Sequence, residues 1–243
     1  MPKIHGKLAR VYISGIDASN FFTSAETADQ VDTAESSGFG DNDKTYLIGM
    51  RTGNIRMSGF YDSGNATGNV DATIRAGLGL DGTQSPIVNI TRGTAMNDMG
   101  DGGVDDLYTS YSPSAPIGGA VAISVDIQAS RGLNFHRTVL PKGTLGTSTS
   151  PGGTTNAWNG SVQTVQGGRG FLQVFQVIGG NPVYSIEHSA DGSTGWTVKA
   201  SFAAASAVGA QVVDISGTIQ PFQRVSVTGG TAVVWVGLYQ PVA

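Results

Sequence analysis

The sequence contains no cysteine and few charged residues. Without cysteine, disulfide bonds and thiolate metal sites are excluded. Charged residues make up 13% of the chain, whereas soluble domains usually have about 25%. A surface with so little charge is poorly protected against association. We therefore expect a protein that buries much of its surface in a larger assembly.

Long apolar runs and basic clusters are also missing. No apolar run reaches the ~18 residues of a membrane-spanning helix, so we expect no membrane partner. The opening MPKIHGKLARVYI lacks the apolar stretch of a signal peptide and is expected to be a mature N-terminus. A net charge of −4 argues against a protein that reads nucleic acid, because such proteins normally present a basic patch.

The charge is divided unevenly along the chain. Residues 1–145 hold 11 Lys and Arg against 15 Asp and Glu, whereas residues 146–243 hold three of each kind. Between them, residues 141–160 (PKGTLGTSTSPGGTTNAWNG) have a composition that is typical of a linker. We predict a first domain at 1–145, a linker at 146–160 and a smaller second domain at 161–243.

Strand patterns dominate both parts. Residues 120–130 alternate strictly, with Val121, Ile123, Val125 and Ile127 on one face and polar residues on the other, which indicates a sheet with one wet face. Residues 51–54 look like a turn, so 46–60 is predicted to be a hairpin. Further strands are predicted at 8–16, 44–50, 54–60, 86–92, 133–140, 170–178, 182–188, 197–202, 210–216, 222–228 and 232–239. The last of these is apolar on both faces and is predicted to be central.

One helix and one long loop interrupt these strands. Asn69 is a good N-terminal cap, Val70 and Ile74 share a helical face, and Gly77 is expected to end the helix. Residues 20–43 show little pattern and predict a long loop, which either orders against a neighbouring subunit or stays a surface loop. The fold class is therefore mainly β. We expect a β-sandwich or rolled sheet with one short helix and a long loop, followed by an immunoglobulin-like or jelly-roll-like β-sandwich.

No catalytic constellation is visible. The three histidines are scattered, and neither a nucleophile elbow nor a phosphate-binding loop is present. The aspartates within 98–106 lack calcium-loop spacing, because the twelfth residue counted from Asp98 is Thr109. We expect no catalytic residue, no metal site, no cofactor and no enzyme. A hydrolase built from distant residues such as His136 and Asp126 is the minor alternative.

Residues 187–196 (EHSADGSTGW) are similar to the S-x-D-G-x-x-W turn of discoidin-like sugar-binding sandwiches. Asp191 and Gly192 predict a hairpin turn. Trp196 either packs at the edge of the core or offers a flat surface on which a sugar stacks. Asp191 and Trp196 are therefore candidate glycan contacts.

Residues 36–62 (SSGFGDNDKTYLIGMRTGNIRMSGFYD) resemble the early hairpin region of the major tail tube proteins of phages with long flexible tails, the siphovirus type. The opening LARVYISG at 8–15 and the alternating strand at 121–129 continue the resemblance. Residues 185–189 and 222–227 resemble the extra outer β-sandwich domain that some of these proteins carry.

The resemblance implies a structural virion protein. Six copies would form a ring by joining their inner sheets, and stacked rings would form the tail tube, the conduit for genome ejection into the host. The implied partners are further copies, a tape-measure protein, and tail terminator and tip proteins, while DNA passes through the lumen without specific binding. The protein would be made in the host cytoplasm and reside in the virion tail.

Two sets of residues become candidates for these roles. Asp126 and Gln128 lie on the polar face of the alternating strand and are the lumen candidates, since an acidic or neutral wall would not retain DNA; alternatively, that face simply meets bulk water. The acidic residues of the predicted long loop are candidates for contacts between subunits or rings: Glu26, Asp29, Asp32, Glu35, Asp41 and Asp43. The alternative function, carried by 191–196, is a virion decoration or glycan-binding protein acting at the cell surface.

Overall fold

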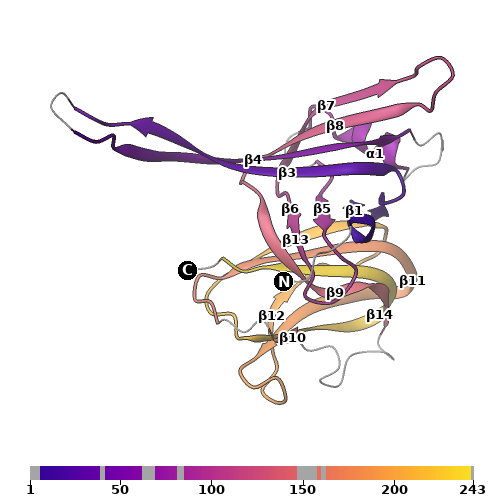
Figure 1. Ribbon diagram of the computed structural model, residues 1–243. Coiled ribbons are helices and arrows are strands. Elements are labelled where there is room, and N and C mark those ends of the chain that lie inside the picture. Colours follow the sequence, from indigo (N-terminus) through magenta and orange to yellow (C-terminus); the bar gives the residue numbers. More distant parts are fainter. Residues whose placement is uncertain are drawn as a thin grey trace.

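The computed structural model describes residues 6–38, 42–61, 69–80, 85–146, 158–159 and 163–241. This part of the chain is mainly β, as predicted, with one α-helix and one 3-10 turn, η1 (Gly6–Leu8). Its strands form two sheets that lie one above the other in Figure 1. Within the same residues, no helix is long and apolar enough to cross a membrane.

The small sheet contains the alternating strand that the sequence predicts. In β8 (Ala122–Ala129), Ile123, Val125 and Ile127 are buried, while Ser124 and Gln128 on the other face are exposed. The order of the four strands across this sheet is β3 (Phe22–Glu35), β4 (Tyr46–Phe60), β8 and β7 (Asp106–Ser114). The sheet thus has one dry and one wet face.

The helix also forms where it is predicted. In α1 (Val70–Gly77), the side chain of Asn69 accepts a hydrogen bond from the backbone N–H of Ala72 at 2.6 Å, which satisfies one of the free donors at the start of the helix. Val70 and Ile74 are fully buried and share a core with Ile55 and Val125 of the small sheet. The helix therefore covers part of the dry face.

The large sheet has ten antiparallel strands and runs through both halves of the sequence. Its order is β12 (Thr197–Ser201), β11 (Gly168–Ser189), β14 (Phe222–Tyr239), β9 (Asn134–Gly146), β6 (Met99–Gly102), β5 (Val88–Thr91), β1 (Arg10–Ile13) and β2 (Ile16–Asp17), with β10 (Trp158–Asn159) on β14 and β13 (Gly209–Ile215) on β11. As predicted, β14 is central, and it lies between β11 and β9.

Two long strands replace four predicted short ones in the second half. The predicted strands 170–178 and 182–188 belong to β11, and 222–228 and 232–239 belong to β14. Their ladder continues through three register irregularities, two of which adjoin the glycines at 179–180 and 229–230. Gly180, at φ 69°, stands so close to Gly229 that a Cβ there would lie 2.2 Å from its carbonyl oxygen. These glycines bend a continuous ladder, whereas the sequence pattern predicts a turn.

The bent strands enclose a core of their own. Leu172 and Val174 from the first part of β11 share a buried cluster with Tyr184 and Ile186 from its second part. Such a cluster between two halves of a folded sheet is the interior of a β-sandwich.

Two predictions for residues 20–60 are wrong. The expected loop at 20–43 is mostly strand β3, and the expected hairpin at 46–60 is the single strand β4. Gly53 makes no turn but allows close packing, because a Cβ there would lie 2.7 Å from the backbone nitrogen of Leu133. The strand in 22–35 lacks an apolar pattern because its side chains beyond Thr27 are all exposed, so its sequence shows no buried face.

The two predicted domains share a ladder and a buried cluster. β9 of the first pairs with β14 of the second from His136 to Gly146. Tyr12, Phe171 and Trp235 form a cluster between them, with 5.6 Å between the ring centroids of Tyr12 and Trp235. Most of the predicted linker, at 147–157 and 160, lies outside the described residues.

Candidate assembly surface

A two-stranded arm projects from the small sheet. β4 pairs with β8 only from Gly53 to Phe60, and from Thr52 back to Tyr46 it pairs with β3 alone. At ~3.3 Å per residue, these seven residues extend about 23 Å beyond the sheet. We call residues 28–38 and 42–53 the arm. It is the long hairpin that leaves the body on one side in Figure 1.

The arm carries several apolar side chains that are exposed to solvent. Ile48 is 83% exposed and Met50 79%, and Leu47, Tyr46 and Val31 are about half exposed or more. Apolar patches on soluble chains mark interaction sites, and an isolated two-stranded hairpin is only marginally stable in water. The arm is therefore a candidate interaction surface.

Polar contacts fix the root of the arm to the body. Arg51 on β4 donates from Nε to Asp29 on β3, at 2.9 Å and 2.8 Å to the two carboxylate oxygens. Its Nη2 also donates to the backbone oxygen of Leu133 at 3.0 Å. Further out, Lys44 pairs with Glu35 at 2.9 Å. Because the root is fixed, the exposed apolar residues are held away from their own body.

Four of the six acidic candidates of the predicted loop lie on a strand. Glu26, Asp29, Asp32 and Glu35 belong to β3 and Asp43 precedes β4, while Asp41 lies outside the described residues. Asp29 and Glu35 hold the arm together through ion pairs.

The lumen candidates lie on the wet face of the small sheet, as predicted. Asp126 accepts a hydrogen bond from Ser110 Oγ at 2.8 Å and pairs with Arg56 at 3.1 Å, and Gln128 is exposed. Glu26 stands opposite Arg56 in the neighbouring strand. On the described body of this face these three charges leave one net negative charge, so the surface is polar and weakly acidic.

The small sheet also has two end strands, β3 and β7. An end strand presents backbone donors and acceptors on its outer side, which makes it a template for pairing with another chain. Outside its pairing with β8, the described part of β7 makes one backbone bridge, an isolated one between Tyr108 and Leu78. The sheet can therefore be extended at β7 and along the exposed residues 28–35 of β3.

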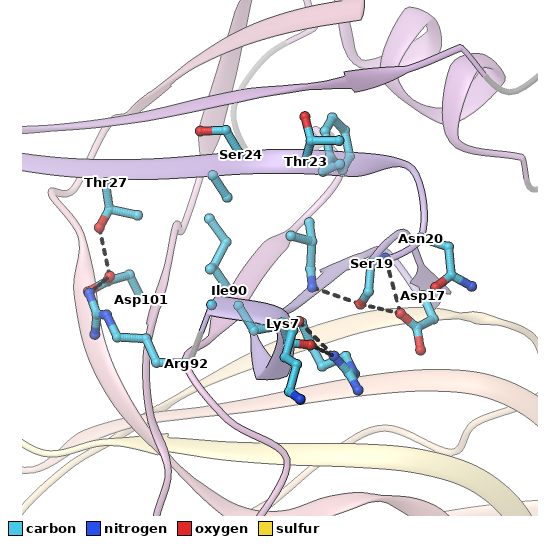
Figure 2. Close-up of a pocket in the computed structure, with 16 residues that line it drawn as sticks. Lys7, Asp17, Ser19, Asn20, Thr23, Ser24, Thr27, Ile90, Arg92 and Asp101 are labelled. Carbon is cyan, nitrogen blue, oxygen red and sulfur yellow. Dashed lines mark hydrogen bonds and ion pairs between the residues drawn. The ribbon is translucent and has the colours of Figure 1, made fainter. Parts of the chain in front are cut away.

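A polar groove that the sequence pattern did not reveal lies between β3 and the large sheet, with a volume of about 710 Å³ (Figure 2). Its acidic residues are already paired: Asp101 bonds Arg92 and accepts from Thr27 Oγ at 2.8 Å. Burial would raise the pKa of Asp17, but hydrogen bonds from Lys142, at 2.6 Å, and Ser19 hold that pKa below its usual value. The groove is thus lined by satisfied ion pairs.

The residues considered for enzyme chemistry do not come together. His136 is fully buried in the large sheet beside Trp235, with ring centroids 5.0 Å apart, whereas Asp126 lies on the wet face of the small sheet. Asp98 accepts from the backbone N–H of Ala95 at 2.6 Å, and Asp105 pairs with Arg131 at 2.8 Å. Over the part of the chain that the structure describes, no group of three His, Cys, Asp or Glu is placed to hold a metal ion.

The two glycan candidates occupy a surface turn. The Asp191 carboxylate accepts from the backbone N–H groups of Ser193 and Thr194, both at 2.8 Å, and these bonds lower its pKa. Trp196 is half-buried, with the guanidinium of Arg224 4.3 Å above its ring. Asp191 therefore shapes the turn, and Trp196 takes part in a cation–π contact.

No protein-family model and no curated protein matches the sequence. Several solved structures are similar in fold. A chain of the virion of a native gene transfer agent particle is 12% identical, with 55% of this chain and 98% of that chain covered and a TM-score of 0.42. The SPP1 tail tube protein is 16% identical, with 54% of this chain and 77% of that chain covered and a TM-score of 0.43. SPP1 Dit, a hub adsorption protein of phages that infect Gram-positive bacteria, is 9% identical, with 96% of this chain and 100% of that chain covered and a TM-score of 0.35.

Proposed function

We propose that this chain is a structural protein that assembles through its β3–β4 arm and its sheet edges into stacked rings, the tube of a phage-type tail. The arm is the observation that carries the proposal. Its apolar side chains, with Ile48 83% exposed, lie beyond Gly53, where the pairing of β4 with β8 ends and no other described strand covers them. A single chain gains nothing from such an arm, whereas a second copy that covers it gains the free energy of apolar burial.

Ring closure follows from the two end strands of the small sheet. When β7 of one copy pairs with β3 of the next, the contact joins two different surfaces and closes once the rotation completes a turn. Joining sheets in this way also removes both exposed edges. A ring of six copies is the number that the resemblance to tail tube proteins implies.

The wet face of the small sheet would then line the bore. Its central charges, Arg56 and Asp126, neutralise each other at 3.1 Å, and Gln128 is uncharged. Such a wall offers DNA no row of cations, so no counterions are released and nucleic acid is not retained. Tape-measure, terminator and tip proteins, genome delivery and a place in the virion tail complete the proposal.

The test is a double substitution on the arm, Ile48→Ser with Met50→Ser. Both side chains are exposed in the single chain, so the fold is expected to survive, while the apolar contact between copies is lost. The concentration needed for assembly should rise at least about tenfold, since two apolar contacts of ~1 kcal/mol each exceed the 1.4 kcal/mol of one decade. Light scattering across a dilution series measures this.

The matched control is Val198→Ser, an apolar residue on β12 of the second half that is 59% exposed. It should assemble like the parent chain. Circular dichroism confirms that each variant is folded. Equal assembly of the arm variant and the parent chain would contradict the proposal.

A further inference from the structure

We infer that the arm of one copy docks on the β7–β8 hairpin of the next copy along the tube, with Ile117 at the centre of the contact. This inference rests on the proposed function, since it names the surface that receives the arm. The β7–β8 hairpin is defined here as β7, β8 and the connecting residues 115–121.

The two protrusions leave the small sheet at opposite ends. β4 and β8 pair from Gly53 with Ala129 at one end to Phe60 with Ala122 at the other. The arm continues beyond Gly53, whereas the turn of the β7–β8 hairpin lies beyond Phe60. Figure 1 shows them on opposite sides of the body. A second copy displaced along the strand direction therefore brings its β7–β8 hairpin to the arm of the first.

The hairpin end is apolar and uncharged. Residues 111–125 contain no Asp, Glu, Lys or Arg. A turn closed by the Gly119 N–H on the Pro116 carbonyl oxygen at 3.2 Å, with Gly118 at φ 81°, presents Ile117 completely exposed to solvent. Phe60, half exposed, lies beside it, because Tyr61 N–H bonds the carbonyl oxygen of Val121 at 2.9 Å.

This surface matches the arm better than the other candidate receiver. The groove between β3 and the large sheet is lined by Arg92, Asp101 and Asp17, which form the ion pairs Arg92–Asp101 and Lys142–Asp17. Seating Ile48 and Met50 there would remove water from those charges without providing new partners for them, which costs free energy. The uncharged hairpin end carries no such penalty, and burial there removes apolar surface from water on both sides.

The contact joins two different surfaces, so it can repeat from copy to copy without limit. Each copy in the tube both inserts an arm and receives one. Copies at the two ends of the tube keep one unoccupied surface each.

The absence of native cysteine allows a direct test. Two variants of the full chain, Ile48→Cys and Ile117→Cys, are assembled separately and as a mixture, and treated with a short bismaleimide. Covalent dimers on a denaturing gel are expected in the mixture at several times the amount found for either variant alone. A mixture of Ile48→Cys with Val198→Cys serves as the control and should give no excess.

Light scattering of the same samples separates the possible failures. Assembled particles without excess dimers overturn the arm–hairpin contact while the proposed function stands. If the parent chain itself does not assemble at any concentration, both fail.

A second measurement applies if a cysteine variant does not assemble. Ile117→Asp should raise the concentration needed for assembly by about tenfold or more, because it places a charge in an apolar contact. Adding Ile48→Lys in the same chain should recover most of this loss, because the two charges meet between copies. Absence of recovery overturns the contact.

Discussion

At the residue scale, two buried ionisable side chains give the fold opposite pH dependences. Burial raises the pKa of Asp106 to about 7, with a smaller contribution from nearby Asp105. Burial lowers the pKa of His136 to about 3, and the nearby positive charge of Arg92 acts in the same direction. Both side chains are therefore uncharged in the folded protein over most of the range between these values.

The sign follows for each group. Between pH 3.8 and about 7, folded Asp106 keeps a proton that the unfolded chain releases, so its contribution lowers the free energy of unfolding as pH rises. Between pH of about 3 and 6.5, His136 is protonated in the unfolded chain but not in the folded protein, so the free energy of unfolding falls as pH drops. Each slope is at most about 1.4 kcal/mol per pH unit, and the two largely cancel where they overlap.

Asp106→Asn should expose the slope of His136. We expect the free energy of unfolding of this variant to fall steadily as pH is lowered from 6.5 to 4.5, whereas the parent chain changes much less over that window. Urea unfolding at pH 4.5, 5.5, 6.5 and 8 measures the difference. Parallel pH profiles for the two proteins would show that Asp106 does not keep its proton in the fold.

At the element scale, the continuity of β4 depends on Gly53. A Cβ there would lie 2.7 Å from Leu133 N and 2.8 Å from its Cγ, so Gly53→Ala must displace the turn before β9. We expect a loss of about 1–3 kcal/mol, typical of overpacking. Gly209→Ala in β13 is the control, because nothing lies within 4 Å of a Cβ at that strand position. Denaturant unfolding compares the two, and equal stabilities would contradict the packing described here.

The elements that could be predicted are those whose pattern is local. α1 has its own cap at Asn69, and β8 alternates between a buried and a wet face. β3 could not be predicted, because beyond Thr27 it buries no side chain and is a strand only through its pairing with β4. In the sequence, the glycines at the bends of β11 and β14 predict turns, because glycine is compatible both with a turn and with a bend in a continuous strand.

The sequence likewise predicts only part of the candidate assembly surface. The wet face with Asp126 and Gln128 follows from alternation alone. The arm does not, because the exposed side chains of Leu47, Ile48 and Met50 look in the sequence like those of a core strand. Only the register, which ends the β4–β8 pairing at Gly53, shows that no sheet covers them.

At the scale of the whole molecule, the two halves are joined firmly. The ladder between β9 and β14 and the Trp235 cluster connect them, so we propose that residues 161–243 move with residues 1–145 as the rings form. In Figure 1 the sandwich formed by the bent strands β11 and β14 lies at the end of the molecule that is farther from the small sheet. With the wet face toward the bore, the sandwich would form the outside of the tube.

The central claim is that copies of this chain close into rings and stack into a hollow tube. Negative-stain electron microscopy of the purified protein over a range of concentrations tests it most directly. We expect stacked rings with an open centre, and side views whose length increases with protein concentration. Only single, unassociated particles at every concentration and salt would contradict the account.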